Sequence, residues 1–266
     1  MRQDSVPSQF SPRFDQLQVT VFVAVQRSPI DVIVITDDAL RMRYPGGKGK
    51  CYQRLINLMP PHQTYIESHL GGGAVMRNKK AAPRSIGLDL DTKVIEQWRA
   101  KQAEMCELHQ VDAVKFLNNY AFTGDELIYV DPPYVPETRR RTKVYRCDYT
   151  KDDHVQLLQC LVALPCKVMI SGYDSELYNR MLVGWRKVSF PAKTHVDVRE
   201  EVVWMNYESS TRLHDSRYLG ETFRDRQTIQ RRQARLRSRI DSMNALERHE
   251  LLQWMQEHYG KAEEVA

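Results

Sequence analysis

An aspartate, two prolines and a tyrosine stand together as Asp131-Pro132-Pro133-Tyr134, directly after the apolar run at residues 127–130. The run predicts a buried strand, and in an open α/β sheet the ligand crevice lies beyond the carboxyl ends of the strands. Asp131 could accept one hydrogen of a planar amine. The carbonyl of Pro132 could accept the other, because consecutive prolines fix the backbone direction. Tyr134 could stack on a base extruded from a duplex. These residue types suit methylation of an exocyclic amine, and a proline-rich turn with a capping aspartate is the alternative.

Two glycine-rich segments lie upstream of this tetrapeptide. Residues 65–75 read as a short strand, a glycine turn and the start of a helix. Glycines let the backbone approach a ligand closely, and a helix N-terminus offers free N–H groups. Residues 44–48, Tyr-Pro-Gly-Gly-Lys, precede a helical stretch at 52–58, and their lysine could reach a carboxylate. Each segment taken alone could also be an ordinary tight turn.

The order of these parts resembles the DNA adenine-N6 methyltransferase family, which uses S-adenosylmethionine. As in phage-like DNA adenine methylases, the lysine motif comes first, then the glycine turn, an acidic strand end at residues 86–89, and the tetrapeptide at 131–134. The resemblance spans residues 42 to 207. It implies an enzyme that transfers a methyl group from S-adenosylmethionine to the N6 amine of a flipped adenine in double-stranded DNA. A bacterial or phage-infected cell is the expected setting.

The resemblance also implies roles for single residues. Lys48 and the glycine turn match the positions that hold the methionine part of the cofactor, Asp89 matches the ribose-binding carboxylate, and Asp112 matches the contact to the adenine amino group. The full set of expected cofactor-binding residues is Tyr44, Gly47, Lys48, Glu67, His69, Gly71, Gly73, Asp89, Asp112 and Ala113. His69 departs from the pattern, because the family commonly carries an apolar aromatic residue there.

A second departure concerns DNA recognition. Family members with a defined target usually carry a long insertion between the acidic strand and the tetrapeptide, and this chain does not. We therefore expect DNA contacts in residues 135–150, where basic and aromatic residues follow the predicted catalytic strand. The candidates are Arg139, Arg140, Arg141, Lys143 and Tyr145. The alternative for this segment is a solvated loop.

The C-terminal region has a composition of its own. Residues 221–239 are rich in arginine, and four arginines fall on one face at helical spacing: Arg224, Arg231, Arg235 and Arg239. This face could bind phosphates or could simply be solvated. Asn244 and Glu247 predict a capping box that opens a final helix through Tyr259.

Strands and helices alternate from residue 42 onward, which predicts an α/β fold. We expect a class I methyltransferase-like, seven-stranded, mostly parallel sheet with helices on both faces, a terminal β-hairpin and a C-terminal helical appendage. The predicted strands are residues 65–67, 85–89, 106–109, 127–130, 167–171, 186–190 and 201–205. We divide the chain into an N-terminal extension of unknown role (1–41), which we expect to be dispensable, a methyltransferase domain (42–207) and a basic helical region (208–266).

Composition narrows the class of protein. The 266 residues carry a formal net charge of +5, which is compatible with a polyanionic partner. The five cysteines show no paired metal-ligand spacing, so we predict reduced thiols and no metal site. The sequence has no apolar run near the roughly 20 residues that span a bilayer, and no usual signal peptide. We therefore expect a cytoplasmic monomer without membrane contact.

Two other functions stay open at this point. One is a methyltransferase for another planar amine, such as an RNA base or an amide, because similar tetrapeptides serve those substrates. The lysine motif ahead of the glycine turn argues against it. The other is a non-catalytic DNA-binding relic with a degenerate cofactor pocket. His69 favours that reading, whereas the intact residues 131–134 oppose it.

Overall fold

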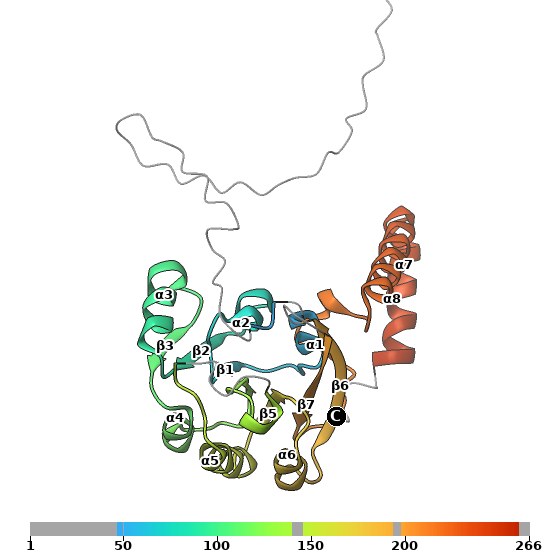
Figure 1. Ribbon diagram of the computed structural model, residues 1–266. Coiled ribbons are helices and arrows are strands. Elements are labelled where there is room, and N and C mark those ends of the chain that lie inside the picture. Colours follow the sequence, from blue (N-terminus) through green and yellow to red (C-terminus); the bar gives the residue numbers. More distant parts are fainter. Residues whose placement is uncertain (1–46, 50, 140–145, 194–197, 261–266) are drawn as a thin grey trace, which may run out of the picture. The chain divides into compact units, whose positions relative to one another are not determined.

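The computed structural model describes residues 47–49, 51–139, 146–193 and 198–260 (Figure 1). Several sequence predictions lie outside this part of the chain. They concern the extension at residues 1–41 and the site residues Tyr44, Arg140, Arg141, Lys143 and Tyr145.

The described residues form a seven-stranded sheet in the order β3-β2-β1-β4-β5-β7-β6. Its strands are β1 (Thr64–Glu67), β2 (Arg84–Asp89), β3 (Glu107–Gln110), β4 (Glu126–Val130), β5 (Lys167–Gly172), β6 (Arg186–Lys193) and β7 (Val198–Met205). The first five strands are parallel, and β7 runs antiparallel to both β5 and β6. The predicted fold class, with its terminal hairpin, is therefore confirmed.

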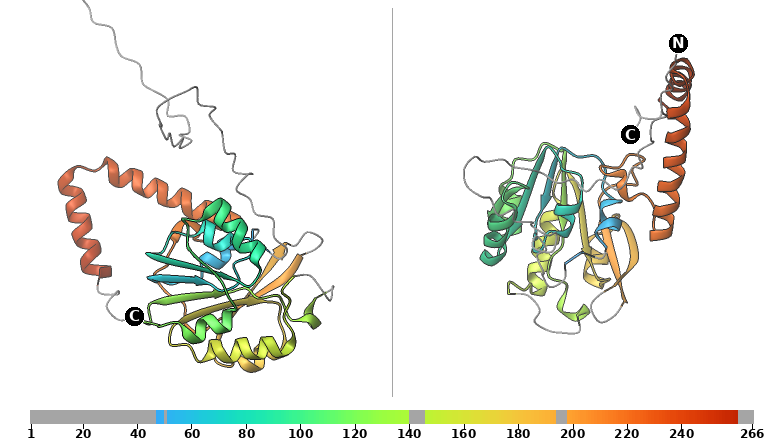
Figure 2. Two further views of the ribbon diagram at one scale, coloured as in Figure 1. Left: turned by 90° about the vertical axis from the view of Figure 1, so that its left-hand side faces the viewer. Right: turned by 90° about the horizontal axis from the view of Figure 1, so that it is seen from above.

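Helices cover both faces of this sheet (Figures 1 and 2). The helices are α1 (Tyr52–Ile56), α2 (Ala74–Asn78), α3 (Thr92–Gln102), α4 (Ala113–Asn119), α5 (Lys151–Val162), α6 (Glu176–Met181), α7 (Phe223–Ser242) and α8 (Ala245–Tyr259). Two short 3₁₀ turns lie at Pro136–Thr138 and Ser216–Tyr218. Helices α1 to α3 pack into one apolar core, and α4 to α6 pack into the other.

The two cores follow from the alternation of side chains along each strand. On β4, Leu127 and Tyr129 enter the core of α1 to α3, while Ile128 and Val130 enter that of α4 to α6. Every residue of β4 is buried. Burial on both faces explains why this strand reads as a continuous apolar run rather than an alternating one.

The strand order fixes where a ligand can bind. The chain adds β2 and β3 on one side of β1, and then returns to add β4 and β5 on its other side. The order therefore reverses between β1 and β4, and open α/β sheets bind ligands at such a switch point. Glu67 at the end of β1 pairs with Tyr129, so the segments that follow β1 and β4 leave the same edge of the sheet side by side.

Helices α7 and α8 begin with capping boxes, formed by Thr222 with Asp225 and by Asn244 with Glu247. The predicted box at Asn244 and the final helix through Tyr259 are thus confirmed. Neither helix buries a residue. No helix among the described residues is long and apolar enough to cross a membrane.

The glycine turn after β1 is fitted around a buried tryptophan. Trp98 of α3 donates from Nε1 to the carbonyl of Gly71 at 2.9 Å. Gly73 has a φ of 54°, and a Cβ atom there would lie 2.1 Å from Cζ2 of Trp98. Gly73 is therefore required both by its backbone conformation and by the indole beside it.

We predict that Gly73→Ala lowers the free energy of unfolding by about 2–5 kcal/mol, the sum of a left-handed backbone cost and overpacking against Trp98. Gly184→Ala is the matched control, because Gly184 has a φ of 85° but no atom within 4 Å of the point where a Cβ would lie. The control should cost only about 1–2 kcal/mol. Urea unfolding measures both, and equal losses would remove the role assigned to Trp98.

Candidate active site

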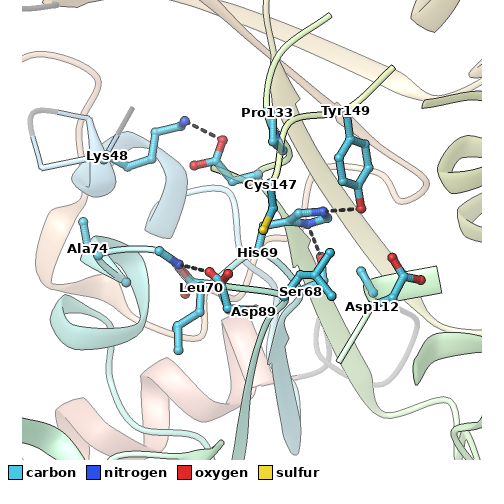
Figure 3. Close-up of a pocket in the computed structure, with 18 of the residues that line it drawn as sticks. Lys48, Ser68, His69, Leu70, Ala74, Asp89, Asp112, Pro133, Cys147 and Tyr149 are labelled. Carbon is cyan, nitrogen blue, oxygen red and sulfur yellow. Dashed lines mark hydrogen bonds and ion pairs between the residues drawn. The ribbon is translucent and has the colours of Figure 1, made fainter. Parts of the chain in front are cut away.

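A cavity lies at the switch point between β1 and β4 (Figure 3). All of the expected cofactor-binding residues in the described part of the chain line it: Gly47, Lys48, Glu67, His69, Gly71, Gly73, Asp89, Asp112 and Ala113. Asp131 and Pro133 of the tetrapeptide line it as well. The fold thus brings together residues that are far apart in the sequence.

Asp89, the last residue of β2, shapes one wall of the cavity. Its Oδ2 accepts from the backbone N–H of Gly71 at 2.9 Å, and its Oδ1 accepts from that of Asp91 at 2.8 Å. Burial raises the pKa of Asp89, and the two N–H groups oppose that shift. Each carboxylate oxygen has a second lone pair, so the group can still accept hydrogen bonds from a diol.

Glu67 and Asp112 both form bonds that hold the cavity wall. Oε2 of Glu67 accepts from the hydroxyl of Tyr65 at 2.9 Å and from the N–H of Met76 at 3.0 Å, which ties β1 to α2. Burial raises the pKa of Glu67 to about 8, against the hydrogen bond from Tyr65. Asp112 caps α4, where its Oδ1 accepts from the N–H of Lys115 at 2.9 Å. Both residues line the cavity as expected, and each has one oxygen engaged by the protein itself.

His69 replaces the expected aromatic residue with a hydrogen-bonded ring. Its Nδ1 lies 3.0 Å from Oγ of Ser68, and its Nε2 lies 2.9 Å from the hydroxyl of Tyr149 (Figure 3). Burial lowers the pKa of His69 to about 3, and His154 acts in the same direction. The ring is therefore neutral near pH 7. The neutral imidazole therefore presents a flat, uncharged surface to the cavity, as an apolar aromatic residue would.

Tyr149 is a cavity residue that the sequence did not reveal. It belongs to the segment before α5 and lines the cavity beside His69. Its position in a basic, aromatic stretch suggested DNA contact instead. The pairing of two residues 80 positions apart leaves no signal in a single sequence, because neither residue type specifies the other.

The carboxylate of Asp131 is held by two donors on one oxygen. Lys48 Nζ lies 2.5 Å from Oδ1, and Oγ of Ser171 donates to the same atom at 3.0 Å. Lys48 also donates to the hydroxyl of Tyr134 at 2.6 Å. Lys48 lines the cavity as expected, but the sequence did not show that the carboxylate it reaches is the one in the tetrapeptide.

Two acceptors beside this cluster are open. Among the described residues, Oδ2 of Asp131 and the carbonyl of Pro132 accept no hydrogen bond. Asp131 borders the cavity, and its side chain is 17% exposed. A carboxylate oxygen and a carbonyl oxygen with free lone pairs can together accept both hydrogens of one amine.

Glu201 of β7 completes the cluster and was also missed by the sequence prediction. The hydroxyl of Tyr134 donates to its Oε1, and Lys48 Nζ lies 3.4 Å from the same oxygen. Burial lowers the pKa of Lys48, but Asp131 and Glu201 outweigh burial and raise it, so Lys48 is an ammonium. Glu200 and Glu201 are adjacent, and only the register of the hairpin decides which one points inward.

Arg139, an expected DNA contact, faces the protein. Its side chain is 6% exposed, and Nη1 lies 2.8 Å from Oδ2 of Asp148. The ion pair joins the segment after the tetrapeptide to the one that leads into α5. In this arrangement the guanidinium is not presented to a phosphate.

The family model of the D12 class N6 adenine-specific DNA methyltransferases matches residues 44–119 and 102–197. These matches cover more than half of the chain, and the chain belongs to this family. It is accordingly a methyltransferase, and its cofactor is S-adenosylmethionine. A comparison with curated proteins found no match.

Several solved structures are similar to the chain at low identity. An rRNA methylase from Streptococcus thermophilus is 9% identical, with a TM-score of 0.40 over 58% of this chain and 93% of that one. A Streptococcus mutans protein assigned as a methyltransferase, in complex with SAH, is 10% identical, with a TM-score of 0.41 over 58% and 93%. Precorrin 8w decarboxylase from Methanobacterium thermoautotrophicum is 9% identical, with a TM-score of 0.40 over 63% and 96%.

The groups around the cavity fit S-adenosylmethionine. Asp89 offers a carboxylate for a diol, Asp112 offers another at the edge where α4 begins, and the neutral ring of His69 adds no positive charge beside a sulfonium. The glycine turn brings backbone to the cavity wall, because Gly71, Gly72 and Gly73 all line it.

We predict that Asp89→Asn weakens S-adenosylmethionine binding tenfold or more, since a hydrogen bond to a charged group contributes about 1.5–3 kcal/mol and about 1.4 kcal/mol is a factor of ten. Titration calorimetry measures the affinity. Asp241→Asn, at the C-terminal end of α7, is the control for charge and should bind normally. Unchanged affinity in Asp89→Asn would move the ribose contact to another residue.

Proposed function

We propose that this protein transfers a methyl group from S-adenosylmethionine to the N6 amine of an adenine flipped out of double-stranded DNA. One observation carries the proposal: Asp131 borders the cofactor cavity, and neither its Oδ2 nor the carbonyl of the next residue, Pro132, accepts a hydrogen bond from the described residues. Membership of the N6 adenine-specific family supports the same substrate.

Different residues of the cavity bind different parts of the cofactor. Asp89 binds the ribose hydroxyls, Asp112 the adenine amino group, and the glycine turn with His69 encloses the methionine part. Bound S-adenosylmethionine supplies an electrophilic methyl group on a sulfonium. Tyr149 is added to this set, because it borders the cavity and fixes the ring of His69 through one hydrogen bond.

The amine side requires two acceptors. The lone pair of an adenine amine is delocalised into the ring, so the nitrogen is a poor nucleophile while it stays planar. Asp131 Oδ2 and the Pro132 carbonyl accept the two N–H groups and favour a tetrahedral nitrogen. The fixed φ angles of the two prolines hold that carbonyl in place.

Tyr134 provides a platform for the flipped base. Its hydroxyl is held by Lys48 and Glu201, and its ring meets Tyr173 edge-on, with centroids 4.5 Å apart. Because the hydroxyl is hydrogen-bonded and the ring packs against Tyr173, the side chain of Tyr134 keeps its position while a base stacks on it. Stacking on an aromatic side chain contributes about 1–3 kcal/mol per base, which offsets part of the cost of unstacking.

We predict that Asp131→Asn abolishes methyl transfer and leaves S-adenosylmethionine affinity within about twofold, because the substitution keeps the shape but removes the charge that binds the amine. Sequencing of genomic DNA from a methylation-free host measures N6-methyladenine, and calorimetry measures cofactor binding. Asp174→Asn, on an exposed carboxylate, is the control. A variant that loses cofactor affinity as severely as activity would place Asp131 in the cofactor site. Wild-type protein that methylates RNA or protein but not DNA would overturn the proposed substrate.

Helix α7 is the proposed place of non-specific DNA contact. Arg224, Arg231, Arg235 and Arg239 share one face and are exposed. None of the four forms an ion pair within the described part of the chain. The base of the helix adjoins α1, where Nη1 of Arg54 donates to the carbonyl of Glu221 at 2.6 Å. A row of guanidinium groups without acidic partners suits the regular charge of a DNA backbone.

We predict that alanine at Arg231, Arg235 and Arg239 together weakens binding to duplexes of any sequence and lowers the slope of log K against log[salt] by up to about 2.7, or about 0.9 per lost phosphate contact. Fluorescence anisotropy over a salt series measures the slope. Alanine at Lys93, Arg99 and Arg180, which are also exposed, removes the same charge elsewhere and should leave it unchanged. A wild-type slope in the α7 variant would return the DNA contact to residues 135–150.

A further inference from the structure

Glu201 is a buried carboxylate that holds the hydroxyl of Tyr134 and also lies beside Lys48. It comes from β7 of the terminal hairpin, and only 5% of its side chain is exposed. It contacts Lys48 and Tyr134. Lys48 Nζ also binds Asp131 and Tyr134, so the ammonium links the three other side chains. Three elements far apart in the chain thus meet at one lysine.

The charges in this cluster do not cancel. Asp131 and Glu201 each bring a carboxylate, and Lys48 is the one cation that contacts them among the described residues. Other titratable groups interact with the cluster: Tyr134, Tyr129, Cys51, Glu67, Tyr65 and Tyr178. Burial raises the pKa of Glu201, Lys48 lowers it, and Asp131 raises it.

A lone Lys48–Asp131 pair would be a poor catalyst. Lys48 Nζ lies 2.5 Å from Oδ1 of Asp131, and as the partner of this carboxylate alone it would neutralise its charge. The proposed reaction needs a negative charge beside the amine. The sulfur–methyl bond breaks with its electron pair left on sulfur, and the nitrogen lone pair forms the new nitrogen–methyl bond. The nitrogen then carries a positive charge and must release one proton.

We infer that Glu201 is a positioning residue that shares Lys48 with Asp131, so that the ammonium does not neutralise the carboxylate that takes the proton from the methylated amine. Glu201 also supplies the negative charge in excess of Lys48, which favours the positive charge as it arises on nitrogen. In addition it fixes the hydroxyl of Tyr134 beneath the flipped base. The inference rests on the proposed function, because it concerns the same amine.

The test is Glu201→Gln, which keeps shape and hydrogen bonding but removes the charge. The expected result is a fall in kcat of tenfold or more, with cofactor affinity unchanged by calorimetry. The acidic limb of the kcat–pH profile should also move to lower pH, because the cluster has lost one negative charge that favours the uptake of a proton. A purely structural role for Glu201 would lower kcat without moving this limb.

Glu200→Gln is the matched control, since Glu200 is adjacent and exposed and loses the same charge. Its kcat and pH profile should equal those of the wild type. If Glu201→Gln loses its fold, Glu201→Asp serves instead, because the shortened carboxylate keeps the charge and should keep the acidic limb in place while lowering kcat. An acidic limb that stays at the wild-type pH in a folded Glu201→Gln would overturn the inference. Wild-type protein without DNA methylation would overturn the proposed function instead.

Discussion

The parallel pairing of β1 with β4 is the constraint on which the site depends. Four residues of β1 pair with four of β4, and the last pair joins Glu67 to Tyr129. A slip of one residue would reverse every side chain of the strand between the two cores. It would also carry the segment after β4 away from the glycine turn after β1. The apolar side chains on both faces of β4 make such a slip costly, so packing in the cores sets the geometry of the cavity rim.

Much of this arrangement could be predicted from the sequence because its signals are local. A buried strand that ends in an acidic residue, a glycine turn before a helix, and a capping box each occupy a few consecutive residues. The strand positions predicted the fold class, which the structure confirms. The order of the motifs predicted the cofactor, which membership of the family confirms. The expected cofactor-binding residues came from the resemblance to the family, and those in the described part of the chain line the cavity.

What the sequence did not reveal depends on side chains that are distant along the chain. Lys48 turns its ammonium to Asp131, Tyr149 bonds to His69, and Glu201 reaches the cluster from the last strand. In each case a polar group avoids being buried without a partner. Residue type alone does not say which of several candidates becomes the partner. Arg139 shows the same limit, because a basic residue in a basic stretch can still be buried against Asp148.

The fit between Gly73 and Trp98 has a consequence for how such sequences can change. The indole occupies the volume that a side chain at position 73 would need, and its N–H holds the turn beside it. Gly73 in the loop and Trp98 in α3 are therefore sterically coupled. A descendant that replaced Trp98 by a smaller residue would lose the hydrogen bond and gain an empty space next to the cavity. Position 73 would then meet less steric restriction, and only its left-handed backbone would still favour glycine. Substitutions at the two positions should accordingly arise together in chains that descend from this one.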